Sequence, residues 1–242
     1  MPLHARDAAA LDTLVADCRR LFGARLTALA LYGEAATAAY RPLVSPLDTV
    51  LLLDRVATDD LRKLRERVGT WQAMRLSVPL VVDAAHLTTA SDVFPLEMLE
   101  LRDRHRLLDG AQDPFAALAT PALPQLRLEL EEQLRGKLLH LRASYLALGG
   151  MRDGLEALLR AACATLDVLM RGMLALADRP RPDAAADVLR AVSELDGVPL
   201  GGLARLDRWC SDEERLAAAD LEALFAAVHD ELAALVERID RR

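Results

Sequence analysis

A change of hydrophobic rhythm near residue 112 is the feature that most constrains the fold of this chain. Before it, short apolar runs bounded by turn residues alternate with segments of helical spacing, and after about residue 122 the spacing is helical throughout. Such a switch is typical of an α+β architecture. We therefore predict a small mixed-sheet domain over residues 1–112, followed by a C-terminal α-helical bundle over residues 113–242. The apolar runs that predict buried strands are LTALALYG at 26–33, DTVLLLD at 48–54 and RLSVPLVVD at 75–83.

Helical segments occur in both halves. In the first half they cover residues 9–23, 58–74 and 94–110, and the last of these, FPLEMLELRDRHRLLDG, is predicted to be one helix that closes at Gly110. In the second half a long amphipathic helix ends at Gly149-Gly150, and a second helix is broken by RPRPD. The last helix is predicted to start at Ser211 as its N-cap.

An apolar seam runs along the last predicted helix in alternating steps of four and three residues. Such spacing favours packing within the bundle, and a homodimer interface is the alternative. The members of the seam are Leu221, Phe225, Val228, Leu232, Leu235 and Ile239.

The composition narrows the class of protein. A formal net charge of −7 argues against a general nucleic-acid-binding surface, which needs clustered cations. Three unevenly spaced cysteines without a CxxC motif argue against a disulfide framework or structural zinc, and they fit a reducing cytoplasm. The N-terminal stretch lacks the apolar core of a signal peptide, and no stretch is apolar for long enough to cross a membrane. We therefore expect a cytoplasmic protein with no membrane association.

The stretch LYGEAATAAYRPLVSPLDTVLLLD, residues 31–54, joins two predicted strands and has the outline of a phosphate-handling loop. A glycine at a strand end, here Gly33, allows the backbone to approach a phosphate closely. Carboxylates two apart on a strand point to the same side and can share divalent cations. Since two such metal ions polarise phosphates and activate an attacking hydroxyl, the loop indicates phosphoryl or nucleotidyl transfer chemistry.

This stretch resembles the signature of the nucleotidyltransferase superfamily related to DNA polymerase beta, in the minimal form of kanamycin nucleotidyltransferase-like proteins. The signature is an apolar strand, Gly-Ser, a short spacer, and then Ser-Asp-apolar-Asp before another strand. Gly33, Ser45 and Asp48 fall on its glycine, second serine and second aspartate. The resemblance implies a nucleotide near Gly33, Glu34 and Ser45. It also implies Mg²⁺ held by Asp48 together with Asp83, the candidate carboxylate at the end of a later strand.

Two residues depart from that signature. Glu34 replaces the first serine and puts an anion where a triphosphate belongs, and Pro46 replaces the first metal-binding aspartate. Because one aspartate holds two Mg²⁺ ions poorly, we predict a degenerate active site with impaired catalysis. Each residue also has a structural interpretation: Ser45-Pro46 is a common turn opener, Asp48 can bond loop amides, and Asp83 can cap a short helix.

These observations favour a nucleotidyltransferase-like pseudoenzyme that binds a nucleotide or small ligand between the two domains. One alternative is an active Mg-dependent nucleotidyltransferase that acts on a small molecule or a protein, in which Glu34 or Asp83 completes the metal site. Another is a non-catalytic protein-interaction module that uses the apolar seam of the last helix.

Two further groups of side chains carry possible chemistry. Arg135 and His140, in RGKLLH, have the Arg-x4-His spacing of HEPN-type ribonucleases, but residues five apart on a helix differ by about 140° in direction. Glu97, Glu100 and Arg104 share a face of the helix predicted over 94–110. They either stabilise that helix or line the cleft opposite Asp48. His105 is predicted to lie on the solvated face of the same helix.

Overall fold

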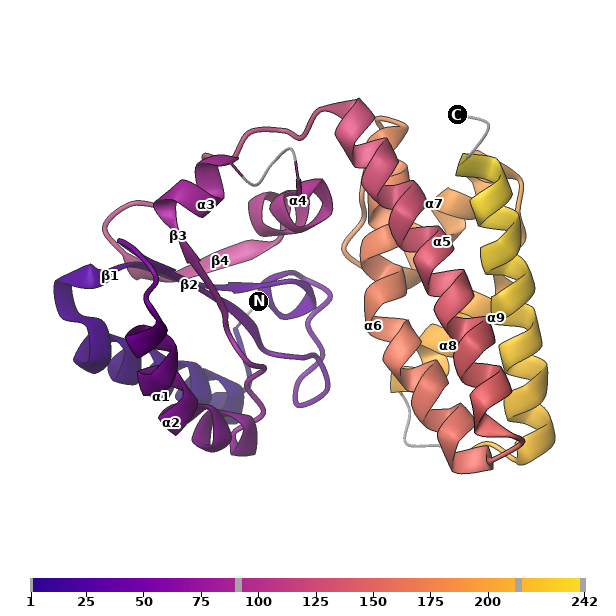
Figure 1. Ribbon diagram of the computed structural model, residues 1–242, viewed down its shortest axis with the longest axis horizontal. Coiled ribbons are helices and arrows are strands. Elements are labelled where there is room, and N and C mark those ends of the chain that lie inside the picture. Colours follow the sequence, from indigo (N-terminus) through magenta and orange to yellow (C-terminus); the bar gives the residue numbers. More distant parts are fainter. Residues whose placement is uncertain (1, 90–92, 212–214, 240–242) are drawn as a thin grey trace. The chain divides into compact units, whose positions relative to one another are not determined.

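The computed structural model describes residues 2–89, 93–211 and 215–239, and the chain divides into two compact units, Met1–Pro121 and Ala122–Arg242 (Figure 1). The first unit contains a four-stranded mixed sheet in the order β3-β2-β1-β4. Strand β1 pairs antiparallel with β2 and β4, whereas β2 pairs parallel with β3. The strands are β1 (Leu26–Tyr32), β2 (Asp48–Leu53), β3 (Leu80–Asp83) and β4 (His105–Gly110).

Helices cover both faces of this sheet. Successive side chains of a strand point to opposite faces, and in β1 and β2 both sets are mainly apolar and must be covered. Leu29, Leu31, Leu51 and Leu53 are buried in one cluster with residues of α1 and α2. The intervening residues of β1 and β2 are buried in a second cluster with residues of α3 and α4. Figure 1 shows the two pairs of helices on opposite sides of the sheet. These helices are α1 (Ala5–Phe22), α2 (Thr58–Ala73), α3 (Ala84–Thr89) and α4 (Pro95–Asp103), with short 3₁₀ turns η1 (Gly23–Arg25) and η2 (Glu34–Ala36).

The predicted α+β class is confirmed, but the single helix predicted over 94–110 is wrong. Helix α4 ends at Asp103, and β4 follows it as the fourth strand. The helical spacing of FPLEMLEL continues into RDRHRLL by chance. The free edge of β1 decides the outcome, because pairing there satisfies a row of backbone groups that would otherwise be left unpaired.

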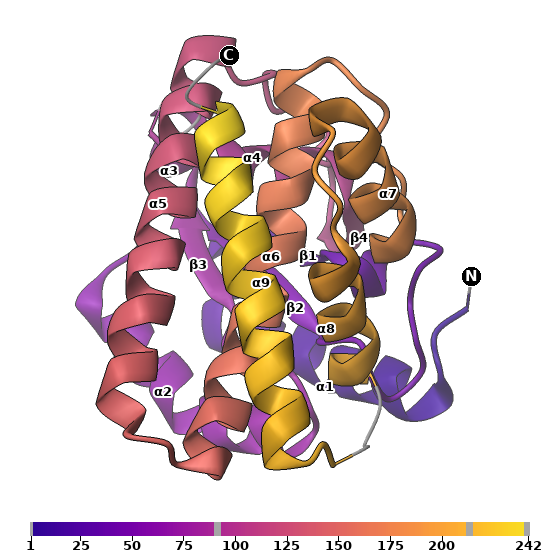
Figure 2. The same ribbon diagram turned by 90° about the vertical axis from the view of Figure 1, so that its right-hand side faces the viewer.

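The second unit is a bundle of helices. Its long helix α5 (Leu123–Leu148) ends at Gly149, which has the left-handed conformation (φ 54°) that glycine adopts without strain. The other helices are α6 (Arg152–Leu176), α7 (Ala185–Asp196), α8 (Gly201–Ser211) and α9 (Ala218–Ile239). Helix α9 lies along α5, as Figure 2 shows. The predicted start of the last helix at Ser211 is wrong, since Ser211 is the last residue of α8.

The apolar seam of the last helix is used inside this unit. All six of its members are buried, and α9 packs against α5, α6 and α8. Packing within the bundle is therefore the correct interpretation of the seam. Because its residues are buried, the seam is not accessible to a second chain or another protein, as the homodimer and interaction-module hypotheses required. No helix in the described part of the chain is both long and apolar enough to span a bilayer.

Candidate functional site

One end of the sheet gathers polar side chains from three adjacent strands. The register pairs Tyr32, the last residue of β1, with Asp48 on β2 and with His105 on β4. Directly opposed residues of antiparallel strands project to the same face of a sheet. That face is the one covered by α4, because Tyr32 packs against the cluster that contains Met98 of α4. Tyr32, Asp48 and His105 therefore form a row beneath α4.

Burial and three carboxylates act on the pKa of Tyr32. Burial raises the pKa of Tyr32 to about 12, and the negative charges of Asp48, Glu100 and Glu97 add to the rise. Burial also raises the pKa of Asp48, and a hydrogen bond from the Ser77 hydroxyl opposes part of that rise. Glu97 and Glu100 of α4 thus both act on Tyr32, the residue paired with Asp48 in the sheet.

Two pairs of side chains border this row. Glu100 accepts a hydrogen bond from Arg104 at 3.1 Å, and both residues are buried. Nε2 of His105 lies 2.9 Å from Asp113, and the His105 ring packs edge-on against Phe115. The predicted place of His105 on a solvated helix face is therefore wrong, since its side chain is only 8% exposed. The segment HRLLDG shows no alternation of polar and apolar residues, so its sequence pattern alone does not reveal the strand.

The loop after β1 is bonded to the protein itself. Gly33 has φ 75° and ψ −153°, a region that is essentially restricted to glycine, and its N–H donates to the carbonyl of Arg104 at 2.8 Å. Glu34 accepts two hydrogen bonds from the guanidinium of Arg41, at 2.9 and 3.2 Å. The fully buried Ser45 hydroxyl accepts from the backbone N–H of Arg41 at 2.8 Å. The three residues predicted to bind a nucleotide thus all bond to other parts of the chain.

The remainder of the loop is fixed in the same way. The Tyr40 hydroxyl donates to Asp7 at 2.6 Å, and the backbone N–H of Leu43 donates to the same carboxylate oxygen. Arg75 donates to the carbonyls of Leu43 and Ser45 from the other side. A loop held at so many points has a defined shape in the absence of a ligand.

Asp83 does not lie near Asp48. In the parallel pair of β2 and β3, Asp83 is the partner of Leu53, five residues along β2 from Asp48. At about 3.3 Å per residue, the two positions are roughly 17 Å apart along the strand. The carboxylate of Asp83 instead accepts from the backbone N–H of His86 at 2.9 Å, at the start of α3. Asp83 is therefore a helix cap, and the prediction that it shares a metal ion with Asp48 needs correction.

The residues at the sheet end do not fit a two-metal centre. Pro46 provides no carboxylate, Glu34 is paired with Arg41, and Asp83 is at the opposite end of the sheet. Within residues 2–89, 93–211 and 215–239, no group of three or more His, Cys, Asp or Glu side chains is placed to hold a metal ion. Asp48 is the one predicted metal ligand that stays at this end of the sheet.

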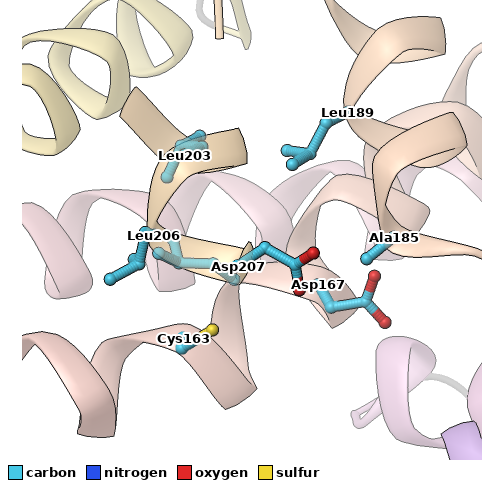
Figure 3. A pocket seen from close by; sticks show the side chains of 8 residues that line it. Cys163, Asp167, Ala185, Leu189, Leu203, Leu206 and Asp207 are labelled. Carbon is cyan, nitrogen blue, oxygen red and sulfur yellow. The ribbon is translucent and has the colours of Figure 1, made fainter. Parts of the chain in front are cut away.

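A pocket in the helical unit lies between α6, α7 and α8 (Figure 3). Its volume is about 30 Å³, enough to hold water and far below what a small-molecule site needs. A hydrogen bond with Cys210, together with burial, raises the pKa of the Cys163 thiol at its wall. The pocket therefore offers neither room for a nucleotide nor an activated thiolate.

Arg135 and His140 both lie on the exposed surface of α5. Arg135 forms an ion pair with Glu131 at 3.3 Å, and Nε2 of His140 is 3.5 Å from the Ser144 hydroxyl. Both contacts join residues four apart on the same helix. The pattern is that of a solvated helix face.

Comparison with known proteins adds to this description. No protein family and no curated protein sequence matches the chain. Among solved structures, the chain is similar to the crystal structure of spectinomycin adenyltransferase AAD(9) from Enterococcus faecialis with ATP and spectinomycin. The TM-score is 0.61 at 10% identity, and the match covers 93% of this chain and 99% of that one. At so low an identity the likeness shows the fold alone, and it confirms the fold that the resemblance of residues 31–54 implied. This chain therefore shares the fold of that adenyltransferase: a four-stranded mixed sheet with helices, followed by a helical region.

Proposed function

We propose that this protein is a nucleotidyltransferase-like protein that binds a nucleotide at the Asp48 end of its sheet and has lost the transfer reaction. The fold supports a nucleotide ligand, because the similar adenyltransferase was crystallised with ATP. The observation that carries the loss of catalysis is the pairing of Glu34 with Arg41, beside Pro46 in place of an aspartate. These two residues leave Asp48 without a second carboxylate from its own loop, and a pair of Mg²⁺ ions requires more than one carboxylate.

Asp48 still suits a single cation. Mg²⁺ in nucleotide sites is commonly held by one or two carboxylates together with the phosphates themselves. Asp48 would supply such a carboxylate, and the Mg²⁺ ion would neutralise its repulsion of the phosphates. Binding is therefore expected to require both Mg²⁺ and the negative charge of Asp48.

Thermal unfolding with each Mg-nucleotide tests this proposal, with Asp48→Asn as the variant and Asp83→Asn as the matched control at the other end of the sheet. A ligand at a hundred times its Kd stabilises the folded state by about 2.7 kcal/mol. For a chain of this size that is a rise in Tm of roughly 5–10 °C. We expect the rise in the wild type and in Asp83→Asn, and its loss in Asp48→Asn or on chelation of Mg²⁺. No rise with any of the four ribonucleotides would refute the proposed binding.

One observation favours a second candidate, an active Mg-dependent nucleotidyltransferase. Glu97 and Glu100 raise the pKa of Tyr32 together with Asp48, so two further carboxylates lie close enough to this end of the sheet to act on Tyr32. Incorporation of labelled nucleotide into a small molecule or a protein tests it. Mg-dependent transfer that is lost in Asp48→Asn and in Glu97→Gln, but kept in Asp83→Asn, would establish the enzyme and replace the pseudoenzyme. Absence of transfer in a protein that binds the nucleotide supports the pseudoenzyme.

A further inference from the structure

Helix α5 is apolar on two opposite faces. One face carries leucines that are buried in the bundle, among them Leu130, Leu134 and Leu141. On the other side Leu128, Leu139 and Leu146 are 68%, 62% and 79% exposed. Leu139 and Leu146 follow Leu128 by 11 and 18 positions. At 100° per residue, the three side chains therefore lie within about 20° of one another around the helix. The three exposed leucines therefore share one line along the helix, away from the leucines buried in the bundle.

The row continues through the residues between the leucines. Leu128, Glu132, Arg135, Leu139, Arg142 and Leu146 follow one another in steps of four, three, four, three and four, which is the heptad spacing of a helix that packs along a partner helix. All six are on the exposed side of α5. We call these six residues the outer seam.

The outer seam is complementary to itself when two copies of α5 run antiparallel. If a two-fold axis passes beside residue 137, each residue of the seam meets the residue equally far from 137 on the second copy. Leu128 then meets Leu146, and Glu132 meets Arg142. At the remaining layer Arg135 meets Leu139, where the aliphatic stem of the arginine can cover the leucine while its charge stays in water.

This pattern matches what an isologous dimer requires, because every contact between two positions occurs twice. Residue 137 is close to the middle of α5, so the two helices overlap over nearly their whole length. A parallel pair would instead place Glu132 against Glu132 and Arg142 against Arg142. Charge thus favours the antiparallel arrangement over the parallel one.

We propose that the outer seam of α5 is the interface of an antiparallel homodimer. The partner is a second copy of this chain, since the seam supplies both the leucines and the opposite charges that its own reverse requires. Half of the seam is charged, so the dimer is weak, with a dissociation constant on the order of micromolar. This interface does not depend on the proposed nucleotide site, which belongs to the first unit.

Charge reversal at Glu132 and Arg142 tests the interface and its register together. Sedimentation equilibrium of the full chain across the micromolar range should show the wild type dimerising. Glu132→Arg and Arg142→Glu alone each place like charges in two layers, and should weaken self-association by at least about tenfold. Mixing the two variants restores both opposite-charge layers, so the mixture should form a heterodimer. The double variant Glu132→Arg/Arg142→Glu should dimerise like the wild type.

Two controls separate this result from general damage. Gln133→Arg changes the charge of α5 on an exposed position outside the seam, and should leave dimerisation unchanged. Arg142 also donates a hydrogen bond to Nε2 of His229 at 3.0 Å, and Arg142→Glu removes that donor. The mixed sample controls for this removal, because the hydrogen bond stays absent from the Arg142→Glu chain while dimerisation returns. A wild type that stays monomeric throughout the micromolar range would overturn the proposal. So would a dimer that both single variants leave intact, or single variants that fail to pair when mixed.

Discussion

The buried carboxylate of Asp60 offers a sharp test of how the first unit is held together. Its two oxygens accept from the guanidinium of Arg25 at 2.8 and 2.9 Å and from the backbone N–H of Ala57 at 3.0 Å, at the start of α2. The side chain of Asp60 is 2% exposed, whereas that of Arg25 is 34% exposed. These bonds, foremost those from Arg25, lower the pKa of Asp60 from 3.8 to about 2.

This shift sets the size of the effect. A difference of nearly two pKa units corresponds to roughly 2.4 kcal/mol of stability. Because Arg25 is partly in water, screening reduces the contribution, and we expect Asp60→Asn to lower the free energy of unfolding by about 1–2 kcal/mol at neutral pH. The folded pKa lies below the unfolded one, so the contribution is present above pH 3.8 and is lost as the pH falls through about 2. The difference between wild type and variant should therefore shrink in that range.

The tryptophans provide the assay. Trp71 is fully buried on α2, and Trp209 belongs to the other unit, so a Trp209→Phe background makes fluorescence report on the first unit alone. Urea unfolding at several pH values then compares Asp60→Asn with Asp59→Asn. Asp59 forms an exposed pair with Lys63, and its loss should cost less than about 0.5 kcal/mol. Equal effects of the two variants, or a difference that is constant with pH, would refute the reasoning.

Three further outcomes follow from the structure. Gly33→Ala should destabilise the first unit by about 1–3 kcal/mol through backbone strain alone, since an added Cβ would lie an ordinary 3.8 Å from Asp48. The control Gly69→Ala, in the exposed part of α2, should stabilise the unit slightly, and thermal unfolding of both variants measures the difference. Leu232→Ala should destabilise the bundle by about 2–5 kcal/mol, measured through Trp209 fluorescence, and leave the oligomeric state unchanged, because Leu232 is buried inside the unit. Burial, with the nearby charges of Asp17 and Asp109, raises the pKa of Cys18 to about 12, so iodoacetamide should label it at neutral pH only after unfolding; labelling in the folded protein would contradict this placement.

The sequence by itself determined the α+β class, three of the four strands and the family resemblance. These are local properties. The apolar runs around Leu29 and Leu51 favour strands that are buried on both faces of a sheet. The backbone conformation at position 33 is one that glycine alone adopts without strain. The apolar seam of α9 could also be predicted, since the spacing of its residues is a property of a single helix and is visible in the sequence. Its partner was open between the bundle and a second chain, and only packing decided for the bundle.

The tertiary structure alone decided which candidates meet. Asp48 and Asp83 both lie at strand ends, but the parallel pairing of β2 with β3 places them at opposite ends of the sheet, and no local pattern encodes that pairing. His105 was predicted on an exposed helix face, but it lies in a strand with its side chain buried, because β4 pairs with the edge of β1. Glu34 and Arg41 are seven residues apart, and the course of the loop between β1 and β2 brings their side chains together. Sequence periodicity reports on one element at a time, whereas a site depends on contacts between elements.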